Sequence, residues 1–133
     1  MQLTWAEPNR ARWVGIRPGH GGEQVAVSAA ATDNQTTIVY TVPASERFFL
    51  TDWTLAMYAK ASEWNYFYVR DESDVTLYHI LRRYYTAASQ GEVAHTHFVP
   101  LEIPAGYDLV VENSGTGCYT YVFIHGWVQA EGV

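Results

Sequence analysis

The sequence predicts an all-β protein: an antiparallel β-sandwich or jelly roll of about eight strands that follows an extended N-terminal arm. From Glu23 onward, short segments that alternate apolar and polar residues are separated by turns of a few residues, which is the pattern of a sandwich. These segments are also rich in β-branched and aromatic residues, which favour strands. The 133 residues have the length of one domain, which we place at residues 24–133, after an arm at residues 1–23.

The first 23 residues lack the period of a strand or a helix. Pro8, Pro18 and the cluster Gly19–Gly22 interrupt regular structure, so we expect an extended arm anchored by Trp5 and Trp13. The arm holds three arginines against two glutamates, whereas the whole chain has a net charge of -6. A slightly basic arm before an acidic body could contact the body of a neighbouring copy; a solvated tail is the simpler alternative.

The first strands can be assigned in chain order. Residues 24–42 alternate and are interrupted by a Thr-Asp-Asn-Gln-Thr turn, which predicts a hairpin. Residues 47–60 predict one long strand, which at this length commonly bends or carries a bulge. Its alternation places five side chains on a common face: Phe49, Thr51, Trp53, Leu55 and Met57. A turn at residues 62–65 then leads into a strand at residues 66–70.

The second half of the chain continues the same pattern. Residues 71–74 predict an acidic turn, and residues 75–85 predict a strand rather than a helix because β-branched and aromatic side chains dominate the segment. Residues 86–91 predict a polar loop. Three more strands follow, separated by turns rich in Pro and Gly: residues 92–103, 107–113 and 118–130.

Two segments share one sequence phrase. In both segments a strand ends at Pro-Ala and is followed by a short turn and an apolar strand: TVPASERFFLTDWTL and LEIPAGYDLVVEN. Proline favours the end of a strand because it has no N–H to continue the ladder of backbone hydrogen bonds. Over residues 38–55 and 100–113, this phrase resembles the strand-Pro-Ala-Gly-strand phrasing of small β-sandwich proteins of bacteriophage virions, including head-decoration and tail-associated jelly rolls. Ser45 stands where that phrasing has Gly. The resemblance implies a structural role in a virion.

The composition favours assembly over chemistry. Ten Tyr and five Trp accompany a charged fraction of only 17%, against about 25% in typical soluble domains, and both aromatic residues are enriched at interfaces. We predict a non-enzymatic homo-oligomer, with a trimer favoured, that also contacts other structural proteins of a particle. Its functional residues are interfacial: Trp5, Arg10, Arg12, Trp13 and Arg17 of the arm, and Trp64, Tyr66 and Tyr68 of the body.

Several partners and locations are disfavoured by the sequence. The acidic net charge argues against general nucleic-acid binding, and no segment has the build of a signal peptide or the length of a membrane span. We therefore expect no membrane partner and a location in the virion, with export by another route or a cytoplasmic location as alternatives. Cys118, the single cysteine, is expected to be a buried, inert thiol.

Carbohydrate binding is the alternative from another functional class. Aromatic rings stack on the flat faces of sugars, and Trp64, Tyr66 and Tyr68 bracket a turn and a strand, with Tyr84 and Tyr85 as further candidates. A buried or interfacial aromatic row explains the same alternation without a ligand.

A metal-dependent enzyme is the second alternative. His95 and His97 are two residues apart and would point to one face of a strand. The run G-x3-H-x-H-x4-E-x3-G resembles the first metal-binding motif of cupins, and this likeness implies His95, His97 and Glu102 as ligands with His125 as the fourth. The two histidines can equally be polar residues of an exposed edge strand. Because no nucleophile elbow or phosphate loop occurs, we predict no metal, no cofactor and no enzymatic activity.

Overall fold

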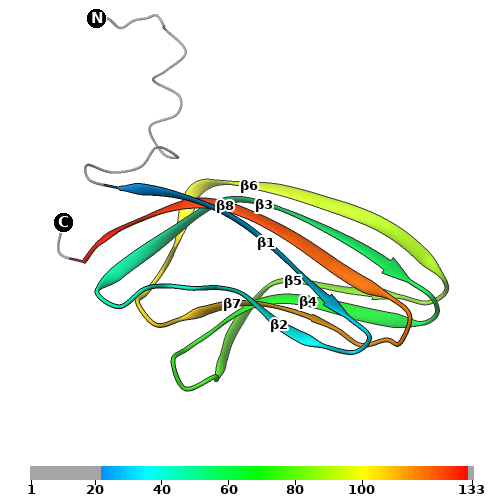
Figure 1. The fold of residues 1–133 in the computed structure, drawn as a ribbon. Helices are drawn as coiled ribbons and strands as arrows, with labels where there is room; N and C mark the ends of the chain where they lie inside the picture. Colours follow the sequence, from blue (N-terminus) through cyan, green and yellow to red (C-terminus); the bar gives the residue numbers. More distant parts are fainter. Residues whose placement is uncertain (1–21, 132–133) are drawn as a thin grey trace, which may run out of the picture.

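The computed structural model describes residues 22–131, which form eight antiparallel strands in two four-stranded sheets packed face to face (Figure 1). The strands are β1 (Glu23–Thr32), β2 (Thr36–Thr41), β3 (Glu46–Ala59), β4 (Glu63–Arg70), β5 (Thr76–Tyr85), β6 (Ser89–Ile103), β7 (Asp108–Asn113) and β8 (Tyr119–Ala130). Sheet A has the order β1-β8-β3-β6, and sheet B the order β2-β7-β4-β5. The predicted all-β sandwich is confirmed.

The predicted arm falls almost entirely outside the described residues, which begin at residue 22. The same is true of its interface candidates: Trp5, Arg10, Arg12, Trp13 and Arg17. No helix in the described part of the chain is long and apolar enough to cross a membrane.

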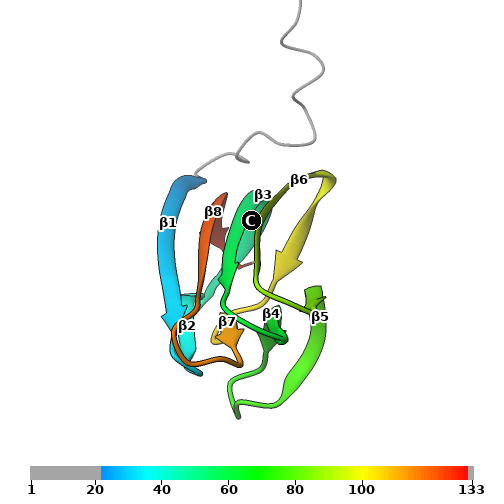
Figure 2. The same cartoon turned by 90° about the vertical axis from the view of Figure 1, so that its right-hand side faces the viewer.

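The chain winds between the two sheets. Only β4 and β5 are consecutive strands that pair with each other, and every other connection between described strands crosses from one sheet to the other. This is the winding of a double-sheet jelly roll. Figure 2 shows the consequence: β1 and β2 lie along one side of the sandwich, and β5 and β6 lie along the opposite side.

The hairpin predicted for residues 24–42 is wrong. β1 pairs with β8 and β2 pairs with β7, so the turn between β1 and β2 joins the two sheets instead of two neighbouring strands. Asp33 and Asn34 make this change of sheet possible by adopting positive φ angles of 52° and 65°, a conformation that Asn and Asp tolerate better than most residues.

A bulge in β3 decides which side chains reach the core. Its register to both neighbours shifts between Leu50 and Asp52, so Thr51 is an extra residue. Leu50 therefore faces inward together with Trp53, whereas Phe49 faces outward and stacks on Trp127 with 5.0 Å between the ring centroids. The sequence predicted that Phe49 and Thr51 share a face with Trp53. This prediction is correct only for the residues that follow the bulge.

The core lies between the two sheets, and both contribute to it. Trp53 of sheet A meets Phe67 of sheet B edge to face, with 5.4 Å between the ring centroids, an arrangement that aromatic pairs prefer. The largest fully buried side chains include Phe48, Leu50, Leu55, Ile103 and Ile124 of sheet A, and Phe67, Leu109 and Val111 of sheet B.

The two Pro-Ala phrases form matched turns that lie side by side. In residues 43–46 and 104–107, the N–H of the fourth residue donates to the carbonyl oxygen of the proline, at 3.2 and 3.3 Å. The third residue has a positive φ in both turns, 63° at Ser45 and 82° at Gly106. Val42 exchanges two backbone hydrogen bonds of 2.9 Å with the second turn, so the repeated phrase corresponds to a paired structural unit.

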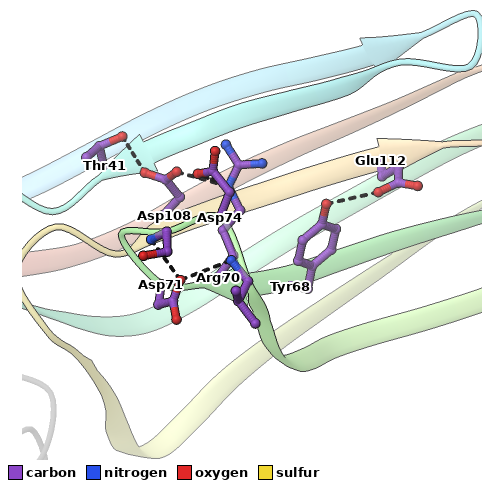
Figure 3. A network of polar contacts seen from close by, with 9 residues as sticks. Thr41, Tyr68, Arg70, Asp71, Asp74, Asp108 and Glu112 are labelled. Carbon is purple, nitrogen blue, oxygen red and sulfur yellow. Dashed lines mark hydrogen bonds and ion pairs between the residues drawn. The ribbon is translucent and has the colours of Figure 1, made fainter.

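An ion pair fastens β4 to the neighbouring strand β7. Asp108 accepts hydrogen bonds from Nε of Arg70 at 3.0 Å and from the hydroxyl of Thr41 at 2.6 Å (Figure 3). Asp74, in the acidic turn after β4, lies 3.4 Å from the same Nε. The carboxylate of Asp71 closes this turn by accepting from the backbone N–H of Ser73 and Val75, which accounts for the predicted turn.

Candidate interaction surfaces

The outer face of sheet A carries a row of exposed aromatic side chains. Tyr119, Tyr121 and Phe123 follow each other on β8, and Tyr58 of β3 stacks beside Tyr119 with 6.1 Å between the ring centroids. We call these four residues the aromatic ridge. The side chains paired with its β8 residues on either flank are small: Ser28, Ala30 and Thr32 on β1, and Thr54 and Ala56 on β3.

The aromatic ridge differs from an ordinary solvated sheet face. An antiparallel sheet that faces water normally presents polar side chains there. Among the described residues, none of the positions paired with the ridge holds an acidic or basic side chain. Aromatic rings flanked by methyl and hydroxyl groups therefore form a continuous surface suited to contact with another protein.

A second apolar feature protrudes from the edge strand β6. This strand pairs with β3 over residues 89–96 and again over residues 101–103, so residues 97–100 bulge away opposite a single residue of β3. Phe98 is 94% exposed and Val99 is 73% exposed. A bulge and a proline both protect an edge from the addition of another strand. With Pro100 at this edge, a partner would contact the side chains of β6 and would not add a strand to it.

A cleft opens beside this bulge, between the edges of β5 and β6. Its volume is about 260 Å³. The apolar lining comes from Trp53, Ile80, Leu81, Val93 and Ala94, and the imidazoles of His95 and His97 complete it. Behind the cleft, the buried rings of Trp53 and Phe67 pack against each other. The cleft therefore does not continue into the core and is a depression in the side of the sandwich.

The two histidines of the cleft lie together, as their spacing predicts. Their ring centroids are 4.7 Å apart, and the indole N–H of Trp53 donates to Nε2 of His97 at 3.2 Å. Burial lowers the pKa of His97, the neighbouring His95 lowers it further, and Asp52 opposes the shift. His97 is therefore held as a neutral imidazole whose Nε2 is an acceptor.

The structure does not bring together the four ligands implied by the cupin likeness. Glu102 pairs with Arg47 at 2.8 Å, and His125 lies on the outer face of sheet A with its Nδ1 3.4 Å from the carboxylate of Asp52. Only His95 and His97 are neighbours. Within residues 22–131, no three His, Cys, Asp or Glu side chains are grouped as a metal site requires.

The body residues predicted as an interface lie on the outer face of sheet B. Trp64 and Tyr66 stack with 4.2 Å between their ring centroids, and both are partly exposed. Tyr68 is only 6% exposed, so little of it remains for a partner. Its hydroxyl donates to Glu112 at 2.9 Å, and burial together with this carboxylate raises the pKa of Tyr68 to about 12.

The aromatic cluster of sheet B is held by its own contacts. The hydroxyl groups of Tyr66 and Tyr84 are 2.9 Å apart, and the guanidinium of Arg82 lies over the Tyr66 ring at 5.2 Å. His79 meets the same ring edge to face. Because neighbours already engage the Tyr66 ring, it is poorly placed to stack on a sugar.

Cys118 is buried, as the sequence predicted. Its thiol donates to Oδ1 of Asn113 and to the carbonyl oxygen of Gly115, both at 3.1 Å. Burial raises the pKa of the thiol, and the Glu63 carboxylate raises it further. A buried thiol that resists ionisation is a poor nucleophile.

Sequence reasoning missed the aromatic ridge and the exposed bulge, although both leave a signal. In β8 the inward set Thr120, Val122 and Ile124 alternates with the aromatic outward set, so the strand is apolar on both faces. A strand of this kind indicates that both faces are covered by protein. In β6, Pro100 after two apolar residues marks a break in the strand.

Comparisons with known proteins add little to these observations. No protein-family model and no curated protein sequence matches the chain. Among solved structures, it is similar to the capsular polysaccharide assembling protein CapF from Staphylococcus aureus, with 14% identity, a TM-score of 0.32 and coverage of 76% of this chain and 22% of that chain.

Two structures of infectious bursal disease virus are also similar. The Gx strain gives 10% identity, a TM-score of 0.37 and coverage of 84% of this chain and 32% of that chain. The Gt strain gives 8% identity, a TM-score of 0.33 and coverage of 80% and 32%. The chain spans less than a third of each of these three chains. These values describe a distant likeness of β-sandwich architecture and assign no function.

Proposed function

We propose that this chain is a non-enzymatic structural protein that assembles with copies of itself and with other proteins of a particle. The observation that carries the proposal is the aromatic ridge on sheet A. An aromatic side chain buries roughly 150–250 Å² when it is covered, and a standard interface buries about 800 Å² on each partner. The four residues of the ridge are 39–46% exposed, so they supply the apolar centre of such an interface, and the small residues beside them extend it.

The non-enzymatic role is supported by the placement of the reactive side chains. Glu102 is paired with Arg47, Asp108 is paired with Arg70, and the thiol of Cys118 is buried. The three histidines suggested as metal ligands are divided between the cleft and the opposite face of sheet A. The mechanism proposed is therefore burial of surface, with no chemical step.

The particle proposed is a virion, with this chain as a capsid-decoration or tail-associated component. This finer assignment rests on the resemblance of residues 38–55 and 100–113 to small phage β-sandwich proteins. Mass spectrometry of purified virions from the source of this chain tests it. The expected result is a stoichiometric amount of the chain in the particles; its absence would contradict the virion assignment and leave self-assembly untouched.

Self-assembly is tested by size-exclusion chromatography with light scattering. We expect the full chain to be an oligomer, with a trimer favoured, at micromolar concentration. Ala30→Glu places a charge beside Tyr121 of the ridge. Because this charge would be buried in the contact, the variant should have a lower molar mass by light scattering than the wild type. Ala44→Glu is the matched control, because Ala44 is an exposed alanine in a turn. A monomeric wild-type chain would overturn the proposal.

Fluorescence and metal analysis of the protein in this chromatographic peak distinguish the alternative functions. A monomer whose tryptophan fluorescence responds to polysaccharide, with the response lost in Trp64→Ala, would instead favour carbohydrate binding. Copurification of about one metal per chain, lost when His95 and His97 are both replaced by alanine, would favour a metal-dependent enzyme.

A further inference from the structure

The exposed bulge and the cleft lie on the same side of the sandwich, one protruding and the other recessed. We propose that the ring of Phe98 from one copy of this chain inserts into the cleft between β5 and β6 of a second copy. This inference rests on the proposed function, since it names one contact through which the chain assembles. It concerns a different surface from the aromatic ridge.

The size and chemistry of the cleft suit a phenyl ring. A cavity of about 150 Å³ lined by aliphatic and aromatic side chains is enough to bind benzene, and this cleft measures about 260 Å³. Its lining from Trp53, Leu81 and Val93 is apolar. A single ring would therefore exchange water for apolar contacts on the faces that it turns toward this lining.

Phe98 does not fill the cleft of its own chain. It is not among the residues that line that cleft, and its side chain is 94% exposed. The ring is therefore available to the equivalent cleft of another molecule.

A second copy fits better than an added strand from another protein. Strand addition along β6 would require a regular edge, which Pro100 and the bulge of residues 97–100 interrupt. Phe98 and the cleft require only that two side surfaces meet. Since every copy carries both features, two copies can insert reciprocally across a two-fold axis, or each can insert into the next around a closed ring.

The charge of the cleft lining does not oppose the entry of a phenyl ring. The side chains that line the cleft include no carboxylate, amine or guanidinium among the described residues. Burial lowers the pKa of His97, which favours its uncharged form at neutral pH. The ring of Phe98 therefore enters a lining that has no carboxylate, amine or guanidinium group.

Light scattering over a concentration series tests the insertion. Phe98→Ser removes the inserted ring, and Val93→Phe fills the cleft; each should weaken self-association about tenfold or more, as expected for a central aromatic anchor. Ile38→Ser removes an exposed apolar side chain on β2, away from both features, and should leave the mass unchanged. Circular dichroism verifies folding, and Ala94→Phe, also in the cleft lining, replaces Val93→Phe if that variant unfolds.

Mixing the two variants gives the sharper test. Phe98→Ser keeps the cleft and Val93→Phe keeps the ring, so an equimolar mixture restores one type of insertion that neither variant makes alone. The expected result is a mixture heavier than either component. If Phe98→Ser assembles like the wild type while Ala30→Glu does not, assembly stands and the insertion is wrong; a monomeric wild type overturns both.

Discussion

Trp53 donates its indole N–H to Nε2 of His97 across 3.2 Å, and this bond links the core of the sandwich to its exposed cleft. Trp53 is almost fully buried and packs on Phe67 of the other sheet, whereas His97 begins the bulge of β6. The acceptor role of Nε2 requires an unprotonated nitrogen. The bond therefore depends on the protonation state of the imidazole.

Acidification is expected to destabilise the fold partly through His97. Its pKa is lowered in the folded chain by burial and by His95, so the unfolded chain binds this proton more readily. The stabilising contribution is fully present above the ordinary pKa of 6.5 and is lost as the pH falls below that value toward the lower folded-state pKa. Urea unfolding at about pH 7.5 and about pH 5 measures this loss.

His97→Gln should reduce the difference between the two pH values, because the amide oxygen accepts from Trp53 without titrating. The difference should not vanish, since burial and Arg82 also lower the pKa of His79. An equal acid loss in His97→Gln and the wild type would refute the assignment.

Replacement of Gly126, which lies opposite the bulge of β3, is expected to destabilise the fold. A Cβ atom there would collide with the carbonyl oxygen of Phe49 and would lie 2.8 Å from the ring of Phe48. Because backbone cannot easily move aside, Gly126→Ala should destabilise the fold by about 1–3 kcal/mol, measured as a lower urea midpoint with an unchanged slope.

Gly91 provides the comparison for this substitution. A Cβ there would lie 2.8 Å from the hydroxyl of Tyr85 and 2.9 Å from Nη2 of Arg83, which are the far ends of side chains on the edge strand β5. These ends can shift, so Gly91→Ala should cost less than about 1 kcal/mol. Equal losses in the two variants would show that the bulge does not impose the requirement at Gly126.

The strands were predictable from the sequence, but their partners were not. Alternation tells which side chains share a face, and it located the segments that form β2, β5 and β8. It carries no information about pairing, so β1 and β2 read as a hairpin although a turn through Asp33 and Asn34 sends them to different sheets. The length of residues 47–60 predicted a bend or a bulge, but a segment that is apolar on both sides of Thr51 gave no indication of its position.

The candidate surfaces were predictable only in part. The pairing of His95 with His97 and of Trp64 with Tyr66 follows from a spacing of two residues in a strand. The aromatic ridge needs β1, β8 and β3 side by side, and the cleft needs β5 and β6 at one side of the sandwich. These arrangements depend on long-range topology, so short-range pattern could not reveal them.

Ser45 and Gly106 occupy equivalent positions in the paired turns, which predicts opposite effects for exchanging their residue types. A left-handed conformation costs a residue with a Cβ roughly 1–2 kcal/mol, while glycine loses more entropy on folding. Ser45→Gly should therefore stabilise the fold by less than about 1 kcal/mol, and Gly106→Ser should destabilise it by about 1 kcal/mol.

The neighbourhood of Gly106 isolates the backbone effect. A Cβ there would lie 3.5 Å from the Cβ of Glu72, an ordinary contact, so the cost of Gly106→Ser comes from its φ angle. Thermal unfolding of both variants provides the measurement. A loss of stability in Ser45→Gly would mean that the hydroxyl of Ser45 contributes more than its strained backbone costs.

Asp108 and Asp74 both lie near Nε of Arg70, but only Asp108 is expected to matter for stability. Asp108 is buried and also accepts from Thr41, whereas the side chain of Asp74 is 70% exposed. Removing the charge in Asp108→Asn leaves the largely buried guanidinium without its close partner and should cost about 3 kcal/mol. Asp74→Asn removes the same charge from an exposed pair and should cost less than about 1 kcal/mol.

Asparagine is the matched replacement at both sites, because it keeps the shape of the side chain and tolerates the positive φ of 64° at Asp74. Urea unfolding of the two variants measures the contrast. Adding Arg70→Met to Asp108→Asn should recover part of the loss, since the penalty arises from an unpaired buried charge and not from missing contact area. If the double variant is as unstable as the sum of the single changes, the two side chains stabilise the fold independently and the ion pair does not fasten β4 to β7.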